Sequence, residues 1–431
     1  MKFTKLALAA ICLFTTAVLA QVPDPAPAQS KPVALVGGTA HLGNGEVIES
    51  AVITFDNGKI TAVADMSSIR VNRGTHDIID TTGKHVYPGF ILAASSVGLS
   101  EVSSVRATVD TSETGRMNPS VRSIIAYNTD SETIPTPTFN GLLMAEVMPG
   151  GGVISGQSSV VQLDAWNWED AAVKSDIGVH VQWPRQKVRR FDFATFTRSW
   201  QDNKDYDKQL GELEKMLSDA RAYKDVKGAP ANLKLDAMTG LFDGSKILFV
   251  HTSSGPDITS SVLFAKELGV QKIVIVGGED ALSVAPFLVK HKVSVILGGV
   301  HRLPGTAEDD IDEPYKLPGL LHEAGVDFCI TYPSLMNARN LPFLAGTAAA
   351  HGMDKEQALA AITGNVARIL GVSDQTGTLE NGKDATLFIS SGDALDMRTN
   401  NVEAAFIMGR NIHLGGMQQR LFERYKKKYG Q

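Results

Sequence analysis

The feature that most constrains the fold is the alternation, in the middle of the chain, between short apolar runs and helix-like stretches. The apolar runs are residues 142–148, 160–163, 178–182, 247–250, 273–276, 293–297 and 327–330. Such continuous runs are typical of parallel strands that are buried on both faces. Residues 206–223, 257–268 and 280–290 lie between runs and carry apolar residues at helical spacing. A repeated strand–helix order favours a (β/α) barrel or a doubly wound sheet.

Both ends of the chain carry β-type sequence instead. The runs are residues 33–36, 51–55, 59–63, 385–389, 402–408 and 410–413. Asn57 and Gly58 lie between two of them and favour a hairpin turn with positive φ. Because the two β-rich ends flank one long middle region, we expect them to pair into a single small sheet domain.

Residues 1–20 have the form of a secretory signal peptide. Lys2 and Lys5 precede an apolar run that ends at the small residue Ala20. We therefore expect cleavage near Ala20 and an exported, periplasmic protein, with residues 21–32 as a Pro-rich leader. The apolar run is shorter than the ~20 residues of a membrane-spanning helix, and no later run reaches that length, so no membrane span is expected.

Charge and cysteine content exclude some functions. The 431-residue chain has a net charge of −6 and no extended basic cluster, which argues against nucleic-acid binding. The short basic tail over residues 424–428 is expected to be a solvated helix end. Cys12 would leave with the signal peptide, and Cys329 lies inside an apolar run. The exported protein therefore has no internal disulfide and no thiolate metal site, and Cys329 is expected to be a core thiol.

Four segments resemble the amidohydrolase superfamily. Residues 82–91 (TGKHVYPGFI) resemble the entry to its first barrel strand, and residues 358–371 (ALAAITGNVARILG) its last barrel helix. Residues 377–387 (GTLENGKDATL) resemble the return into its β-sandwich, and residues 57–63 (NGKITAV) the sandwich hairpin. The resemblance is greatest to the imidazolonepropionase-like exported amidohydrolases, in a sub-branch whose metal motif on the first strand is altered.

The resemblance implies a (β/α)8 TIM barrel with a small β-sandwich domain built from both chain ends. The implied divisions are a signal peptide (1–20), a leader (21–32), a first part of the β-sandwich (33–86), the barrel (87–376), a second part of the β-sandwich (377–415) and a C-terminal helix or tail (416–431). It also implies a hydrolase that acts on non-peptide C–N bonds of a small-molecule substrate.

Members of the superfamily usually hold one or two divalent ions, which activate water for hydrolysis. The usual ligands are an HxH motif at the end of strand 1, histidines on strands 5 and 6, and an Asp on strand 8. In this chain Ala94 and Ser96 stand at the HxH positions, Gly277 at the strand 6 position and Tyr332 at the Asp position. Only His251, at the strand 5 position, is retained. One histidine does not hold zinc tightly, so a divalent metal such as Zn is only weakly supported.

Three residues are candidates for catalysis. His251 lies at the C-terminal end of a barrel strand, where barrel active sites lie, and is either a metal ligand or a general base. The alternative is a histidine that is only hydrogen-bonded in the remnant of a pocket. Glu279 follows the next strand and is a candidate carboxylate base. Tyr332 either donates a proton or fills the space that an ion would occupy.

Four residues are candidates for a substrate pocket. Glu101 and Arg106 follow the first barrel strand and either line the mouth or belong to a surface loop. Gln157 ends a glycine-rich loop that either binds a ligand through its backbone N–H groups or forms a tight turn. His180, together with nearby tryptophans, forms either a pocket wall or part of the core.

Three functional hypotheses follow. The first is an exported amidohydrolase-like hydrolase. The second is a catalytically inactive paralogue that binds a small molecule or pairs with an active homologue. Assembly either as a homo-oligomer or with a homologous amidohydrolase is left open. The third is metal-free hydrolysis by His251 with Glu279. The chain contains no GxSxG or SxxK motif, so a nucleophilic serine is not indicated.

Overall fold

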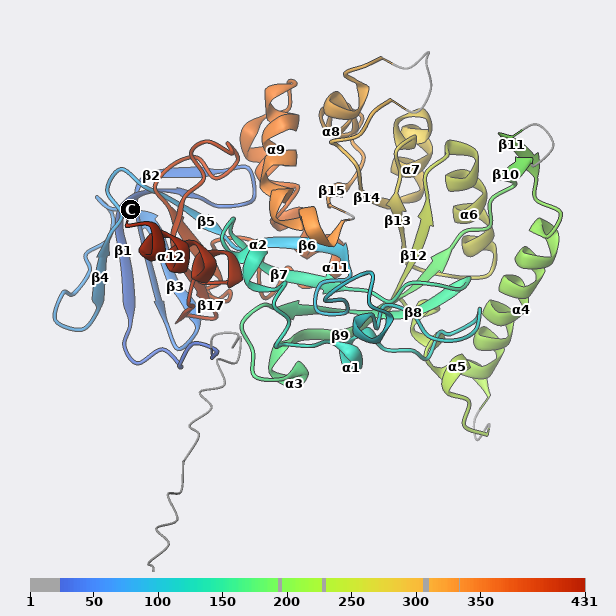
Figure 1. Cartoon of the computed structure of the whole chain (residues 1–431), viewed down its shortest axis with the longest axis horizontal. Helices are drawn as coiled ribbons and strands as arrows, with labels where there is room; N and C mark the ends of the chain where they lie inside the picture. Colours follow the sequence, from blue (N-terminus) through green and yellow to red (C-terminus); the bar gives the residue numbers. More distant parts are fainter. Residues whose placement is uncertain (1–23, 193–195, 227–229, 305–309, 333, 431) are drawn as a thin grey trace, which may run out of the picture.

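The computed structural model describes residues 24–430 except 193–195, 227–229, 305–309 and 333. The predicted signal peptide lies outside the described residues and remains a prediction. Two large sheets dominate the molecule (Figure 1): a barrel-like sheet wrapped by helices, and a second sheet beside it.

The barrel sheet has the strand order β6-β7-β8-β9-β12-β13-β14-β15. Its strands are β6 (Phe90–Ser95), β7 (Leu142–Val147), β8 (Ile154–Gln162), β9 (Ala172–Gln182), β12 (Ile247–Thr252), β13 (Ile273–Gly277), β14 (Ser294–Leu297) and β15 (Phe328–Ile330). Every apolar run of the middle region lies in or beside one of these strands, which confirms the expected barrel.

One strand runs against the expectation of a parallel sheet. β8, which contains the predicted run 160–163, is antiparallel to both β7 and β9. Only residues 148–153 separate β7 from β8. A parallel crossover needs a dozen or more residues, so this short connection forces a hairpin return.

The first and last barrel strands are joined indirectly, so the barrel is nearly rather than fully closed. The Ile330 amide of β15 donates to Ala361 O at 2.9 Å, and the Ile91 amide of β6 donates to Ile362 O at 3.1 Å. The Thr331 hydroxyl also donates to Ala93 O across this seam. Ala361 and Ile362 therefore take the place of a strand pairing.

Helices cover the outside of the barrel. They are α1 (Ser123–Ala126), α2 (Pro135–Thr138), α3 (Trp168–Ala171), α4 (Tyr206–Asp225), α5 (Leu233–Asp236), α6 (Gly255–Glu267), α7 (Ala285–His291), α8 (Glu313–Glu323), α9 (Leu341–Ala350) and α10 (Lys355–Ala360). Short 3-10 turns span Arg106–Thr108, Thr239–Leu241, Ala281–Val284 and Leu335–Asn340. Strands β10 (Lys187–Asp192) and β11 (Thr197–Asp202) form a separate hairpin. The predicted helices over 206–223, 257–268 and 280–290 are confirmed in type. No helix among the described residues is both long and apolar enough to cross a lipid bilayer.

The barrel interior has its own apolar core. Residues that alternate along the strands, such as Met144 and Phe249, point inward and form one buried cluster. α11 (Gly364–Leu370) contributes Val366, Ile369 and Leu370 to the same cluster. Cys329 belongs to it as well, and burial raises the pKa of its thiol, as expected for a core cysteine.

The second sheet joins the two ends of the chain. Its order is β18-β17-β16-β5-β1-β2-β3, with β4 beside β1. The strands are β1 (Val33–His41), β2 (Val47–Asp56), β3 (Lys59–Asp65), β4 (Asp77–Asp80), β5 (His85–Pro88), β16 (Leu387–Ser390), β17 (Val402–Ile407) and β18 (Arg410–Asn411). β16 pairs with β5, so the expected pairing of both ends is observed. The hairpin turn at Asn57 and Gly58, both with positive φ, is also confirmed.

The described part of the leader is fastened to the body. Ala26 is buried, and its amide donates to Asp164 Oδ2 at 3.0 Å. Arg410 Nη1 donates to the same oxygen at 2.6 Å. Gln29 accepts from the Gly58 amide at 3.0 Å. These contacts tie the leader to the barrel and to the second sheet at once.

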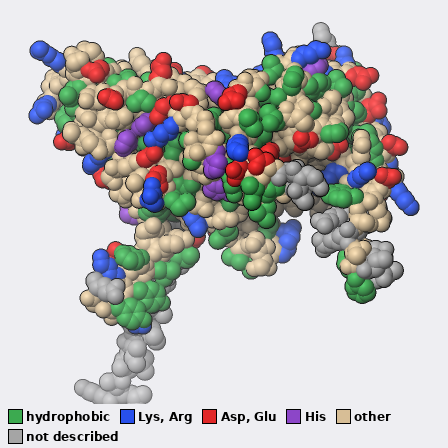
Figure 2. Space-filling model, turned by 90° about the horizontal axis from the view of Figure 1, so that it is seen from above, with side chains coloured by type: hydrophobic (Ala, Val, Ile, Leu, Met, Phe, Trp, Pro, Cys, Tyr) green, Lys and Arg blue, Asp and Glu red, His purple; other side chains and the backbone are tan. Residues whose placement is uncertain are grey.

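Charge is evenly distributed on the face that Figure 2 shows. Lys and Arg side chains are mixed there with Asp and Glu side chains, and no broad region of one sign stands out. This face therefore offers no basic surface for a nucleic acid.

We expect Gly141→Ala to destabilise the fold more than Gly382→Ala. Both glycines have positive φ, where alanine is strained by about 1–2 kcal/mol. A Cβ at position 141 would also lie 2.5 Å from the buried ring of Phe388, where the barrel meets the second sheet, whereas a Cβ at 382 would have nothing within 4 Å. Overpacking adds roughly 1–3 kcal/mol. Denaturant unfolding measures the difference, and equal losses in the two variants would contradict the tight contact.

Candidate active site in the barrel

A chain of three polar side chains crosses the barrel interior. Glu146 comes from β7, His180 from β9 and His251 from β12. His180 Nδ1 lies 2.9 Å from His251 Nε2, and His180 Nε2 lies 3.3 Å from Glu146 Oε1. Glu146 and His180 are fully buried, whereas His251 is half-buried. The chain therefore runs from the dry interior towards the surface.

Strand alternation explains why these side chains meet. Val147, Val179 and Val250 are immediate neighbours of the three polar residues, and their side chains belong to the core between the barrel and its helices. Because successive side chains of a strand point to opposite faces, Glu146, His180 and His251 point inward. The His180 ring also stacks on Phe249, with ring centroids 4.5 Å apart.

The Glu146 carboxylate is held by two further donors. Ala94 N donates to its Oε2 at 2.9 Å, and Ser158 Oγ donates to its Oε1 at 2.7 Å. Ala94 has a φ of +49°, which is unusual for a residue other than glycine, and it lies in a bulge of β6 between Leu92 and Ser95. Such backbone strain costs about 1–3 kcal/mol and is typical of functional sites. Ala94 therefore serves this site through its backbone amide.

The arrangement of donors assigns the histidine protons. His180 Nε2 faces a carboxylate oxygen, and although the contact is not aligned as a hydrogen bond, a lone pair there would be repelled. Nε2 therefore carries the proton, and His180 Nδ1 accepts from His251 Nε2. His251 Nδ1 is then the nitrogen with the free lone pair, at the half-buried end of the chain. This assignment rests on the hydrogen-bond network.

The environment keeps His251 neutral. Burial, followed by the proximity of His180, lowers the pKa of His251 to about 3. At neutral pH its imidazole is therefore in the proton-accepting form.

A cavity adjoins the C-terminal ends of β12 and β13. It has a volume of about 920 Å³, and its lining includes Ser253, Ser254, Glu279 and Arg302. A second cavity of about 540 Å³ shares Ser253 and Ser254 with it. Both contain Trp200 from the β10–β11 hairpin. Space for a small molecule therefore lies at the C-terminal end of β12, lined by Thr252 and Ser253 rather than by His251 itself.

Glu279 lies in this cavity wall with one oxygen unpaired. Its Oε2 is buried and has no hydrogen-bond partner. A Cβ on Gly277 would be 3.3 Å from this oxygen and 2.9 Å from Thr252 O. The Glu279 carboxylate therefore occupies the space that a side chain at position 277 would need. Val276, not Gly277, is paired with His251 across the two strands.

The remaining predicted residues do not join the three-residue chain. Tyr332 is half-buried and packs against the core outside the barrel interior. Arg106 Nη1 donates to Val109 O at 2.6 Å, and Glu101 Oε1 accepts from Asn128 Nδ2 at 3.5 Å, both contacts within the loops that follow β6. Gln157 accepts from Lys246 Nζ.

Of the pocket residues predicted from sequence, His180 alone lies in the interior chain. Gln157 is on the opposite face of β8 from the inward-pointing Ser158. Glu146 and Ser158 were not predicted. Glu146 is the single charged residue in the apolar run 142–148, and a carboxylate inside a buried strand is the signal that could have found it.

The donor set does not fit a metal centre. Within the residues that the structure describes, no group of three or more His, Cys, Asp or Glu side chains is arranged to hold a metal ion. His180 and His251 direct nitrogens at each other rather than at a shared point. Ala94 has no ligand atom in its side chain, and a Ser96 hydroxyl is a poor zinc ligand.

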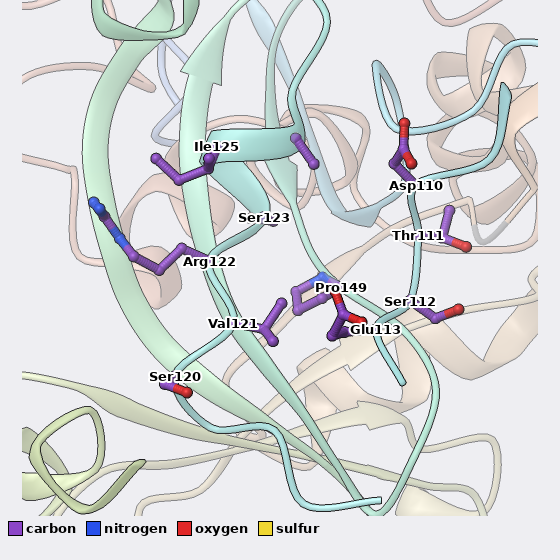
Figure 3. A pocket seen from close by; sticks show the side chains of 11 residues that line it. Asp110, Thr111, Ser112, Glu113, Ser120, Val121, Arg122, Ser123, Ile125 and Pro149 are labelled. Atoms are coloured by element: carbon purple, nitrogen blue, oxygen red, sulfur yellow. The ribbon is translucent and has the colours of Figure 1, made fainter. Parts of the chain in front are cut away.

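A separate cleft lies away from the histidines (Figure 3). Residues 110–113 form one side and residues 120–126 the other, with Pro149 between them. Its volume is about 350 Å³, and its single basic side chain, Arg122, is paired with Asp176 at 2.8 Å. None of the predicted catalytic residues lines this cleft.

Comparisons with known proteins agree with this architecture. The sequence profile of the amidohydrolase family matches residues 312–412. No curated protein matches the chain in sequence. The chain is similar to a solved amidohydrolase from Thermotoga maritima MSB8, with 21% identity and a TM-score of 0.76 over 88% of this chain and 99% of that one.

Two further solved structures share the fold at lower similarity. A Xaa-Pro dipeptidase with bound methionine in its active site has 15% identity and a TM-score of 0.53, over 89% of this chain and 100% of that one. A molinate hydrolase has 15% identity and a TM-score of 0.53, over 91% and 96%. The chain is thus similar to the amidohydrolase family in sequence over residues 312–412, and to solved amidohydrolases in its fold.

We expect the stability of the protein to fall in acid partly through His251. An unfolded histidine has a pKa near ~6.5, whereas burial lowers that of folded His251 to about 3. Between these values the unfolded chain binds the extra proton, so the free energy of unfolding decreases as the pH falls through this window. The slope for one such group is about 1 kcal/mol per pH unit.

Urea unfolding of wild type and His251→Gln at several pH values measures this effect. The variant should lose about that much of the slope below pH ~6.5. Gln182→Asn, at the position paired with His251, changes no titratable group and should keep the wild-type slope. An unchanged slope in His251→Gln would show that folding does not lower the pKa of His251.

Proposed function

We propose that the protein is a hydrolase of non-peptide C–N bonds in small amide-like molecules, with His251 as a metal-independent general base. The observation that carries the proposal is the neutral His251 at the open end of the buried chain from Glu146 through His180. Its place at the C-terminal end of β12 is where barrel enzymes carry their active sites. The amidohydrolase fold supports hydrolysis as the reaction class.

A histidine with a low pKa is a weak base, and the chain from Glu146 through His180 to His251 compensates for this weakness. When His251 Nδ1 takes a proton from water, its Nε2 proton moves to His180 Nδ1. The Nε2 proton of His180 then moves to Glu146 Oε1. The three transfers leave both rings neutral and place the proton on a carboxylate. The Glu146 carboxylate that receives the proton is held in place by Ala94 N and Ser158 Oγ.

Hydrolysis then proceeds by ordinary addition and elimination. The water oxygen attacks the carbonyl carbon while its proton enters the chain at His251. The C–N bond breaks as the same proton returns through His251 to the leaving nitrogen. Glu279 Oε2, which has no protein partner, is the acceptor we assign to an N–H group of the substrate.

Export, the sub-branch of the family and the kind of substrate are parts of the same proposal. We infer an exported, periplasmic member of the sub-branch in which Ala94, Ser96 and Gly277 replace the usual ligands, with a small-molecule substrate. The signal-like residues 1–20 and the substituted positions support it. The pairing of β16 with β5 supports a small β-sandwich domain from both chain ends.

We expect His251→Gln to lower kcat by roughly 10²–10⁴-fold, because the proton acceptor is removed. The measurement is release of amine from a panel of cyclic amides, lactams and N-acyl amino acids. His322→Gln, on the exposed side of α8, is the matched control and should turn over like wild type. Wild-type kcat in His251→Gln would refute its role as base, and an inert wild type across the panel would favour the ligand-binding alternative.

We expect activity to survive removal of metals. Because the described donor set does not converge on an ion, dialysis against a chelator should leave kcat within about twofold of its starting value. Elemental analysis of the purified protein should find well under one equivalent of Zn, Mn or Fe. Loss of activity on chelation, with recovery on adding back one metal, would contradict the metal-independent reaction.

A further inference from the structure

The last helix is amphipathic, yet none of its side chains is buried. α12 (Met417–Tyr429) contributes no residue to the core. Its large apolar side chains are exposed, among them Phe422 at 62% and Tyr429 at 67%. Figure 1 shows this helix, in red, outside both sheets. A helix with this pattern normally buries its apolar side, so its exposure requires an explanation.

Helical geometry gathers the apolar residues on one side. At about 100° per residue, Met417, Leu421, Tyr425, Tyr429 and Phe422 fall within an arc of about 140°. We call this arc the apolar face of α12.

Basic residues border the apolar face on both sides. Arg424 and Lys426 lie at its two edges, and Lys428 lies within it. Their cationic groups approach the aromatic rings: Lys426 Nζ is 5.6 Å from the Phe422 ring centroid, and Lys428 Nζ is 5.1 Å from that of Tyr429. Long basic side chains at such edges can extend their charges away from an apolar phase while their stems remain in it.

The polar side of α12, not the apolar face, is directed to the body of the protein. Arg420 Nη2 is 3.0 Å from Glu132 Oε2, and Gln419 has a buried amide oxygen. Both residues lie on the side of the helix opposite the apolar face. The helix is therefore attached through its polar side, and its apolar face is turned outward.

We propose that α12 is a membrane-surface helix that binds anionic lipid through its outward apolar face and basic border. Apolar and aromatic residues on one side, with basic residues along its borders, are the features of helices that lie in the lipid interface. Charge supports this occupant. α12 carries Arg420, Arg424, Lys426, Lys427 and Lys428 against Glu423 alone, in a chain whose net charge is −6.

An anionic bilayer fits the helix better than a protein groove. Basic residues occupy both edges of the apolar face and one position within it, and a flat anionic surface contacts all of them at once. The same surface would repel the acidic body of the protein. We therefore expect α12 to contact the lipid first and the barrel to stay away from it.

Vesicle co-sedimentation of the full-length folded protein tests the proposal. The probes are vesicles of phosphatidylglycerol and phosphatidylcholine in equal parts, and vesicles of phosphatidylcholine alone. We expect binding to the anionic vesicles that is at least ~10-fold tighter and that weakens with added salt. The double variant Leu421→Asp/Phe422→Asp should lower that binding at least ~10-fold, because it removes apolar contact and adds repulsion.

A matched control separates the helix from general surface apolarity. Leu233→Asp/Leu263→Asp changes two exposed apolar residues on α5 and α6 and should bind like wild type. Both double variants should keep the wild-type circular dichroism and amine-releasing activity, because neither pair is buried or lines the cavities. The vesicle assay therefore tests lipid binding independently of the proposed hydrolase function.

Three outcomes would overturn the proposal. One is equal binding of wild type to both kinds of vesicle, and another is full binding by Leu421→Asp/Phe422→Asp. The third is failure of wild type to bind anionic vesicles. If light scattering then shows a concentration-dependent dimer that the same variant abolishes, the apolar face is instead an interface between two copies of the chain.

Discussion

The barrel depends on the seam between its first and last strands. β6 and β15 do not pair, and the backbone of Ala361 and Ile362 connects them. Asn365 strengthens the seam, since its Nδ2 donates to Phe328 O at 3.2 Å. Asn365 belongs to α11, and the residues that follow it in this helix contribute to the apolar core of the barrel interior. Ala361, Ile362 and α11 lie within the segment that the amidohydrolase profile matches.

The same seam bears on the site. β6 carries the bulge at Ala94, and the preceding carbonyl of Ala93 accepts from Thr331 across the seam. With that carbonyl occupied, the strained amide of Ala94 is turned to the carboxylate of Glu146. Closure of the barrel and orientation of the buried carboxylate are thus achieved by consecutive residues. A substitution in the seam is therefore expected to displace His251 through Glu146 and His180.

The sequence was sufficient for the architecture but only in part for the site. Apolar runs and turn residues predict the barrel strands because burial on both faces leaves a local signal. The antiparallel direction of β8 follows from the short connection that precedes it, not from the apolar pattern of the strand. His251 and His180 could be named as candidates from the sequence, but their contact with each other and with Glu146 could not. Glu146 and His180 lie on different strands, and their contact arises from barrel closure, which no local pattern encodes.

The donor chemistry explains how one interior can favour proton transfer over metal binding. A metal requires several lone pairs that converge on one point, and each ligand must be free of a proton. The interior of this barrel instead directs His180 Nδ1 and His251 Nε2 at each other, while Ala94 N and Ser158 Oγ engage the Glu146 carboxylate. Burial lowers the pKa of His251, and the Glu146 carboxylate in the same interior is held by Ser158 Oγ, so both features depend on one enclosed environment.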